Sequence, residues 1–433
     1  MTSRRRFLQA GTTIAGAAII PTRFAEASTD TNPSTIPPPI ASLKSMKEQA
    51  RPISVMERRE RQEKARALMR ANEFDAILLM EGTSLNYFTG IRWWGGERMF
   101  AMVLPAKGQA FYVCPAFEEG RAREQIARTF DEKQADVRVW QEDENPYQRL
   151  AEGLQDRGIL TGKVGVEETV RFVFSEGVGK AAPQARLSSA TPVTAGCRMI
   201  KSRAELELMR LASQVTLTAY RAVHRSLREG MTQFDVGKLV EAAHDQLGFA
   251  GDALVEVGKY SAFPHGSVQS QVVREDMPVL IDGGCRVEGY ESDITRMLLI
   301  GKPPDKLKHV FEIVQRAQNA ALAAARPGVE CGAVDAAARK VITDAGYGPD
   351  YKYLTHRLGH GIGMDGHEWP YLVRGNSTKL AANMTFSDEP GIYIRGEFGV
   401  RLEDVMHITE DGAELFTAQS PSLQDPFGSS SEA

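Results

Sequence analysis

Residues 356–367, His356-Arg-Leu-Gly-His360-Gly-Ile-Gly-Met-Asp-Gly-His367, form a dense polar cluster in sequence that is otherwise small and apolar. A second cluster lies within residues 387–404 and includes Glu389, Arg401 and Glu403. Three of the eight histidines fall within the first twelve-residue cluster, and glycines flank the middle one. Glycine lets neighbouring backbone pack closely, so one imidazole can point inward. The pattern indicates a ligand site, not a solvated surface.

Two carboxylates upstream complete a metal-ligand pattern. Asp282 follows an apolar run, and after a glycine turn a second strand carries Asp293 back alongside it. Glu389 and Glu403 flank a similar strand, turn and strand, so two hairpins would each offer two carboxylates with His360 between them. Four carboxylates and one imidazole suit a pair of divalent ions of the manganese, cobalt or zinc type.

The order Asp, Asp, His, Glu, Glu resembles the pita-bread metallopeptidase family, which contains methionine aminopeptidase, aminopeptidase P, prolidase and the metal-free creatinase. The resemblance covers residues 196–420 and is specific, because all five positions match in order and in local context. It implies two divalent metal ions, with manganese expected first and cobalt, zinc or iron as alternatives. The implied metal ligands are Asp282, Asp293, His360, Glu389 and Glu403.

Four further positions resemble substrate-side residues of this family. His265, in Phe263-Pro-His265-Gly, corresponds to a histidine that hydrogen-bonds the substrate, and His356 and His367 correspond to two more. Arg401 is typical of the proline-directed branch, which implies Xaa-Pro substrates. The resemblance therefore predicts His265, His356, His367 and Glu389 as catalytic residues, and His265, His356 and Arg401 as substrate-binding residues.

The implied reaction is hydrolysis of the N-terminal Xaa-Pro bond of dipeptides or short peptides. Two ions bridged by Asp293 and Glu403 would lower the pKa of a shared water toward neutrality, and Glu389 could take its proton. His265 and His367 would hydrogen-bond the intermediate. Arg401 either receives the carboxylate of a dipeptide or supports the ligand strand.

Two other functions remain open. Another hydrolase or lyase reaction could use the same metal site, because the family also contains members that hydrolyse organophosphates, cleave creatine or act as lyases. A catalytically silent peptide-binding protein is the third reading, and the complete ligand set disfavours it. Taken singly, Asp282 would be read as an ordinary turn residue and Glu403 as a solvated strand residue. Two departures from the family pattern affect fine substrate preference: Asp388 stands where an uncharged residue is common, and Asn383 where glycine is common.

Composition agrees with a soluble two-domain enzyme. The chain has 433 residues, of which 42% are hydrophobic and 25% charged, and its formal charge of -4 gives no footprint for nucleic acid. No apolar run beyond the N-terminus reaches the length of a membrane-spanning helix. Two-domain members of the family are commonly dimers or tetramers, so we expect a homodimer or higher homo-oligomer.

The N-terminus resembles a twin-arginine signal peptide over residues 1–27. Arg4-Arg5-Arg6 precedes an apolar stretch that ends at Ile20, and Ala25-Glu-Ala27 offers a cleavage site. The prediction is a periplasmic or exported protein. The alternative is a basic amphipathic N-terminus of a cytoplasmic protein.

The remaining chain divides into a proline-containing linker (28–52), an α/β domain (53–195), a catalytic domain (196–422) and a flexible tail (423–433). In the first domain we predict a helix over 57–72, strands over 76–80, 137–140 and 164–166, and a hairpin of 100–104 with 110–114. Asn86 to Gly90 resembles a turn of the creatinase–prolidase branch, and Trp93-Trp94 favours packing over substrate recognition.

Four helices are predicted in the catalytic domain: from Ser202 to Gly230, from Thr232 to Gly248, over 304–325 and over 333–345. With the long hairpins between them, they indicate an α+β domain with an antiparallel sheet backed by helices. The resemblance implies an internal two-fold. The four cysteines lie far apart and favour buried free thiols.

Overall fold

The computed structural model describes residues 36–93, 95–129 and 135–428. The predicted signal peptide, the first part of the predicted linker and Trp94 lie outside the described residues. Trp93 stacks on Phe100, with ring centroids 3.9 Å apart, which agrees with the packing role expected for it.

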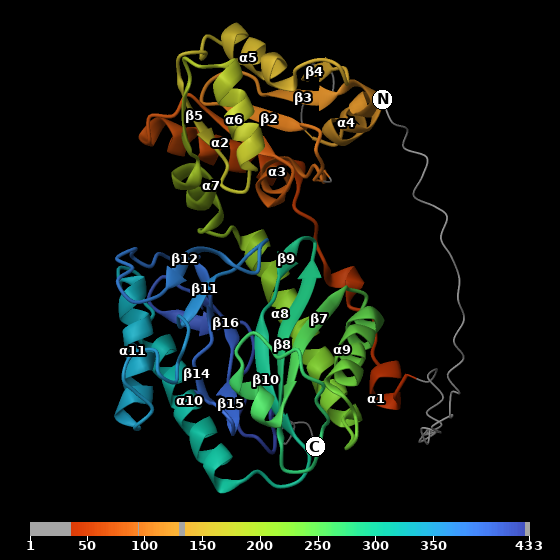
Figure 1. Cartoon of the computed structure of the whole chain (residues 1–433), viewed down its shortest axis with the longest axis vertical. Helices are drawn as coiled ribbons and strands as arrows, with labels where there is room; N and C mark the ends of the chain where they lie inside the picture. The colour runs from red at the N-terminus through yellow and green to blue at the C-terminus, as the bar shows by residue number, and fades with distance from the viewer. Residues whose placement is uncertain (1–35, 94, 130–134, 429–433) are drawn as a thin grey trace, which may run out of the picture. The chain divides into compact units, whose positions relative to one another are not determined.

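The amino-terminal domain is built on one mixed sheet of six strands in the order β4-β3-β2-β1-β5-β6 (Figure 1). The strands are β1 Ala76–Met80, β2 Ala101–Pro105, β3 Phe111–Pro115, β4 Asp136–Trp140, β5 Lys163–Val166 and β6 Arg186–Ser189. β1 pairs antiparallel with β2 and parallel with β5. The predicted strands and hairpin of this domain are confirmed, and β6 is an additional strand.

Helices cover both faces of this sheet, because successive side chains of β1 point into two different cores. Ile77 and Leu79 share a core with α2, whereas Leu78 packs in the core that contains α5 and α6. The helices are α2 Val55–Ala71, α3 Thr83–Thr89, α4 Glu119–Ile126, α5 Pro146–Asp156, α6 Phe172–Ala181 and α7 Thr191–Arg198, with the short η2 Ala116–Glu118. The predicted α/β layout is therefore confirmed.

The carboxy-terminal domain contains two antiparallel sheets. One has the order β10-β8-β7 with β9 paired to β8, and the other has the order β12-β11-β13-β16-β17. The strands of the first are β7 Gly251–Val257, β8 Pro278–Val287, β9 Tyr290–Glu291 and β10 Ile294–Leu299; those of the second are β11 Gly359–Gly361, β12 Glu368–Leu372, β13 Thr385–Asp388, β16 Asp404–Ile408 and β17 Ala413–Leu415. β14 Gly391–Ile394 and β15 Phe398–Arg401 form a separate hairpin.

A pair of helices covers each of these sheets (Figure 1). α8 Arg203–Ser226 and α9 Gln233–Leu247 contact β8 and β7, whereas α10 Asp305–Ala324 and α11 Cys331–Asp344 contact strands of the second half. The order of two helices followed by a hairpin therefore occurs twice, as the internal two-fold requires. An isolated bridge between Thr295 and Glu403 joins the two sheets.

Helix boundaries in this domain follow the predicted capping residues. The Ser202 side chain accepts a hydrogen bond from the backbone N–H of Glu205, and the Glu205 carboxylate accepts one from the backbone N–H of Ser202. α8 therefore begins in a capping box. α9 begins after Thr232 and ends at Gly248, which adopts a left-handed conformation. α8 is shorter than predicted, because the backbone becomes extended at Leu227. Asn383, where the family commonly has glycine, has a φ of 69°, a conformation that asparagine tolerates.

Two segments contain more structure than the sequence predicts. Within the predicted linker (28–52), α1 Pro38–Ala41 and η1 Lys47–Gln49 form, and Ile40 is fully buried against α8 and α9. Likewise Leu423 and Phe427, within the predicted tail of 423–433, are buried in the two cores. The average polarity of each segment does not reveal the single apolar residues that pack into a hydrophobic core.

Three smaller features complete the fold. The stretch from Asn86 to Gly90, predicted as a turn, belongs to α3 and its left-handed cap. All four cysteines are buried and free. Among the described residues, no helix is both long and apolar enough to cross a membrane.

Candidate metal centre

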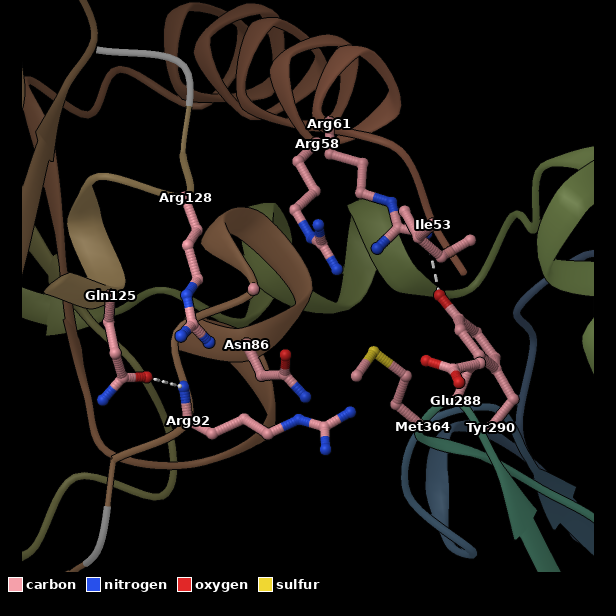
Figure 2. A pocket seen from close by; sticks show the side chains of 11 residues that line it. Ile53, Arg58, Arg61, Asn86, Arg92, Gln125, Arg128, Glu288, Tyr290 and Met364 are labelled. Carbon is pink, nitrogen blue, oxygen red and sulfur yellow. Dashed lines mark hydrogen bonds between the residues drawn. The ribbon is translucent and has the colours of Figure 1, made fainter. Parts of the chain in front are cut away.

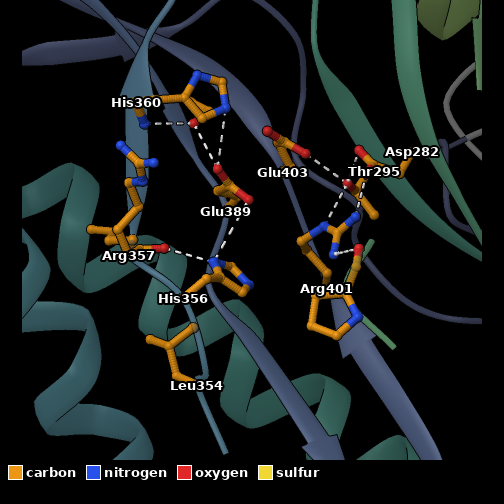
Figure 3. A network of polar contacts seen from close by, with 12 residues as sticks. Asp282, Thr295, Leu354, His356, Arg357, His360, Glu389, Arg401 and Glu403 are labelled. Atoms are coloured by element: carbon orange, nitrogen blue, oxygen red, sulfur yellow. Dashed lines mark hydrogen bonds and ion pairs between the residues drawn. The ribbon is translucent and has the colours of Figure 1, made fainter. Parts of the chain in front are cut away.

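The fold brings the five predicted ligands to one cavity. Figure 3 shows four of them: Asp282, His360, Glu389 and Glu403. Asp282 lies on the central strand β8, and Asp293 immediately precedes β10. Glu389 directly follows β13 and Glu403 directly precedes its partner β16, while His360 is the middle residue of β11. Both sheets therefore contribute ligands to a single centre.

Three overlapping groups of ligand atoms lie close enough to hold ions. The groups are Asp282, Asp293 and Glu403; His360, Glu389 and Glu403; and Asp293, His360 and His367, with one ligand atom per residue and these atoms within 4.8 Å of one another. His360 Nε2 lies 3.3 Å from Glu389 Oε1 and 3.7 Å from Asp293 Oδ2. Oxygen and imidazole donors at these separations fit divalent ions of the predicted kind, and Glu403 is shared as a bridging ligand would be.

Glycines on β11 permit this arrangement, because β12 and β13 lie close on either side. A Cβ at Gly359 would lie 2.0 Å from the carbonyl oxygen of Ser387, and one at Gly361 would lie 2.5 Å from that of Glu368. Only glycine fits such contacts. The inward direction expected for His360 from its flanking glycines is thus confirmed, and its side chain is 2% exposed.

The carboxylates repel one another in the metal-free protein. Burial, with a further contribution from Asp282, raises the pKa of Asp293 to about 8, and burial together with Asp293 raises the pKa of Glu403 well above its usual range. Thr295 Oγ1 lies 2.7 Å from Asp282 Oδ1 and 2.6 Å from Glu403 Oε2. A hydroxyl has one hydrogen to donate, so Thr295 can donate to only one of these two carboxyl groups at a time.

Glu389 behaves differently from the other acids. Burial alone would raise its pKa, but the hydrogen bond from His360 and the charge of that ring outweigh burial and hold the pKa of Glu389 at about 2. The same contact with Glu389 outweighs burial at His360 and raises the pKa of the imidazole. His360 and Glu389 therefore form an ion pair.

The three other predicted histidines line the same cavity of about 130 Å³. The His367 ring stacks on that of His360, with centroids 3.7 Å apart. Burial and the nearby His360 lower the pKa of His367 to about 4, so its imidazole is neutral near pH 7. His356 Nε2 lies 2.7 Å from the hydroxyl of Tyr393. His265 stands on the exposed loop after η3 Gly258–Ala262.

Arg401 also lines the cavity, but most of its donors are already used (Figure 3). The guanidinium forms an ion pair with Asp282 and donates to Thr295 Oγ1, to the Tyr393 hydroxyl at 2.9 Å and to the carbonyl oxygen of Pro264 at 3.1 Å. Arg401 thus holds one ligand and the loop that carries His265, which gives it the supporting role. A direct contact with substrate stays a prediction.

Three residues of the site were not identified from the sequence. Thr295 sits between two ligands, and Tyr393 connects Arg401 to His356. Arg357 lines the cavity with its guanidinium carbon 4.2 Å from the centroid of the Tyr371 ring. Its place directly after His356, inside the quoted cluster, was the one available signal.

The two domains match two family descriptions. Residues 207–410 match metallopeptidase family M24, and residues 61–200 match the creatinase/prolidase N-terminal domain. The chain is 34% identical over 362 residues to an Xaa-Pro dipeptidase of Lactobacillus delbrueckii subsp. lactis, covering 82% of this chain and 96% of that protein. It belongs to metallopeptidase family M24.

Solved structures of family members agree with this assignment. The dipeptidase PepE from Mycobacterium ulcerans superimposes with a TM-score of 0.80 at 33% identity, over 86% of this chain and 99% of that one. A dipeptidase from Pyrococcus horikoshii gives a TM-score of 0.75 at 32% identity, over 83% of this chain and 98% of that one. The chain is therefore a metallopeptidase with a pita-bread catalytic domain and a creatinase-like amino-terminal domain.

Metal uptake by this M24 enzyme should release protons. Asp293, with a raised pKa of about 8, is mostly protonated in the metal-free protein at pH 7, and the pKa of His360 is raised as well. Both must lose their protons to bind a cation, so metal affinity should rise with pH up to about pH 8. Titration calorimetry with Mn²⁺ in two buffers of different ionisation enthalpy should report release of about one proton or more. Equal heats in both buffers would contradict it.

Proposed function

We propose that the enzyme hydrolyses the N-terminal Xaa-Pro bond of dipeptides or short peptides with two divalent metal ions, manganese first among the alternatives. The observation that carries this proposal is that all nine predicted site residues line one cavity of about 130 Å³. The Xaa-Pro dipeptidase named among its relatives supports the substrate class.

The divalent ions, when bound, supply a Lewis acid and lower the pKa of water at the site. Glu389 is ionised and lines the cavity between His360 and His356 (Figure 3), so it can accept the proton of the attacking water. Neutral His367 can hydrogen-bond the tetrahedral intermediate, and His265, on the facing loop, can help pass a proton to the leaving nitrogen. The leaving group of an Xaa-Pro bond is a secondary amine, for which this proton is needed.

A larger cavity beside the ligands suits the free amino group of the substrate. Its volume is about 1050 Å³, and it reaches Asp293. Acidic side chains outnumber basic ones along its lining, with Glu241, Asp245, Asp252, Glu288 and Glu291 against Lys47, Arg92 and Arg286. An ammonium group is favoured beside such a surface. This feature supports cleavage at the N-terminus of the peptide.

Arg357 is the better placed receptor for the free carboxylate of a dipeptide. Within the described part of the chain, its guanidinium contacts no carboxylate, whereas Arg401 is bound to Asp282. A dipeptide carries its carboxylate about one residue from the scissile bond. The planar fork of arginine suits that group.

Replacing Arg357 with methionine should raise the KM for an Xaa-Pro dipeptide about 10-fold to 100-fold, the cost of one charge-assisted hydrogen bond. The same change should leave the KM for the corresponding Xaa-Pro amide almost unaltered, because the amide has no carboxylate. Steady-state kinetics on both substrates measures the difference, with the exposed Arg374→Met as control. A dipeptide-selective loss in Arg401→Lys instead would assign the role to Arg401.

The His367→Ala variant should show a turnover number lower by about 10²-fold with its metal content intact, because the ring acts on the intermediate and not as a ligand. Turnover assays paired with elemental analysis test this. Loss of the metal together with activity would show that His367 is a ligand. This outcome must be checked, because the His367 ring stacks on that of His360.

One experiment tests the function as a whole. The manganese-loaded protein is incubated with Xaa-Pro dipeptides, longer Xaa-Pro peptides and matched peptides without proline, and release of the N-terminal residue is measured. Cleavage confined to Xaa-Pro peptides supports the proposal. Turnover of organophosphates or creatine analogues alone would favour another hydrolase or lyase reaction, and binding without turnover would favour a silent peptide-binding protein.

We also propose export through the twin-arginine route to the periplasm, and assembly into a homodimer or higher homo-oligomer. The paired arginines at positions 4–6 support export, and a fusion of residues 1–27 to a folded reporter tests it. Replacing both Arg4 and Arg5 with lysine should retain the reporter in the cytoplasm. Light scattering measures the mass of the assembly, and a monomer would remove the second proposal.

A further inference from the structure

A third cavity, distinct from the two described above, has no predicted metal ligand in its lining. Four arginines line it (Figure 2). Its volume is about 350 Å³. Arg58 and Arg61 come from α2, Arg92 from the segment after α3, and Arg128 from the turn that follows α4. Figure 2 shows their guanidinium groups turned toward a common space, which the turn carrying Glu288 faces from the other side.

Among the described residues, carboxylates balance only part of the positive charge in this cavity. Arg61 has its counter-ion in Glu205, with Nη2 to Oε1 at 3.5 Å, and also donates to the Tyr290 hydroxyl. In contrast, the guanidinium groups of Arg58, Arg92 and Arg128 contact no carboxylate among the described residues. Glu288 is the one acidic side chain of the lining.

Arg58 has the most unusual surroundings of the four. It is half-buried, and its Nε is a buried donor without a hydrogen-bond partner in the described structure. Gly90 approaches its side chain so closely that a Cβ there would lie 2.7 Å from the guanidinium carbon. Burial and the neighbouring Arg61 both lower the pKa of Arg58, which shows that the site favours an added negative charge.

We propose that this cavity binds a small multivalent oxyanion, a phosphoryl group or a di- or tricarboxylate. Arginine forks match the planar or tetrahedral oxygens of such groups and bind them in bidentate fashion. The volume suits a small molecule, since ligand pockets begin at about 300 Å³. The Asn86 amide and the Tyr290 hydroxyl, also in the lining, provide neutral hydrogen-bonding groups.

The cavity communicates with the catalytic side of the enzyme. Asn86, Arg92 and Glu288 also line the acidic cavity that reaches Asp293. The β8–β9 turn that bears Glu288 leads through β9 to that ligand. A bound anion would therefore place its charge beside the acidic cavity that we propose receives the amino group of the substrate.

The test titrates the manganese-loaded, full-length protein with sulfate, inorganic phosphate and succinate at constant ionic strength, with chloride as the reference ion. Calorimetry should show one saturable site for at least one of these anions, and the preferred anion separates tetrahedral from carboxylate ligands. Arg58→Gln and Arg92→Gln should each weaken binding about tenfold or more. Arg70→Gln, an exposed arginine on the same helix, is the matched control and should bind as the wild type does.

Three outcomes would overturn the proposal. The first is the absence of saturable binding up to about 20 mM anion, since weaker binding reflects surface charge alone. The second is binding that both substitutions leave unchanged, which would place the anion at the metal ions. The third is a changed oligomer mass in Arg58→Gln combined with a wild-type protein that binds none of the anions. That result would assign the cavity to an acidic side chain from a second copy of this chain. Because Arg92 is exposed, its variant remains informative if Arg58→Gln fails to fold.

Discussion

The Glu403→Gln variant should lose essentially all peptidase activity, by about 10³-fold or more in kcat/KM, together with one equivalent of metal. Glu403 belongs to two of the three ligand groups, one with Asp282 and Asp293 and the other with His360 and Glu389. An amide offers one neutral oxygen in place of two charged ones, so it cannot bridge two cations. Elemental analysis and peptide turnover measured on the same preparation check the prediction.

A matched control lies on the neighbouring β14–β15 hairpin. Glu397 is an exposed carboxylate at its turn and pairs with Lys306, so Glu397→Gln makes the same chemical change away from the ligands. This variant should keep both metal equivalents and full turnover. Two bound ions and wild-type rates in Glu403→Gln would show that the bridging assignment is wrong, and Asp293→Asn should then be normal as well.

The Arg296→Met variant should be less stable than the wild type by about 3–5 kcal/mol, the cost of leaving one buried charge without its partner. Arg296 and Asp404 are both 0% exposed and form an ion pair at 2.6 Å. The same guanidinium donates to the carbonyl oxygen of Glu403 at 2.8 Å, so the loss should also disturb the ligand strand. Urea unfolding of the metal-loaded protein followed by circular dichroism measures the change.

The residues around Arg296 explain why its replacement should lower the stability strongly. Asp388 lies opposite Asp404 in the strand register, is fully buried, and has two carboxyl oxygens without a hydrogen-bond partner in the described structure. Burial, with Asp404 and Glu389 contributing, raises the pKa of Asp388 well above its usual range. Without Arg296 the buried charge of Asp404 would lie beside this acid with only the neutral donors Gln318 and Thr417.

Two comparison variants separate the buried charge from simple loss of an arginine. Arg274 is exposed and lies 4.0 Å from Glu229, so Arg274→Met should change stability by less than about 0.5 kcal/mol. The double variant Arg296→Met with Asp404→Leu should regain part of the lost stability, because neither charge remains buried. A single variant as stable as the wild type would mean that water reaches Asp404.

The sequence was most informative where one chemical requirement fixes one residue. The ligands could be assigned because strand ends, glycine turns and hard donors leave few alternatives, and Gly359 and Gly361 indicated a close approach around His360 that the structure contains. The capping box at Ser202 similarly fixed the start of α8. In each case a local rule and the overall fold require the same residue.

The sequence was least informative where a role depends on partners far away in the chain. Thr295 reads as an ordinary strand residue, and only the folded chain places its hydroxyl between Asp282 and Glu403. Ile40 was hidden by its polar neighbours, although it fills a core between two helices. Nor does the sequence reveal that His244 is fully buried, with its ring bonded to the carbonyl oxygen of Val240.

The bridge between Thr295 and Glu403 joins two halves that each hold an incomplete ligand set. Asp282 and Asp293 belong to the first half, and the other three ligands to the second. A chain in which one half has not yet folded therefore has nowhere to retain a pair of ions. Stable metal binding at all five predicted ligands would therefore report that both halves of the domain have folded.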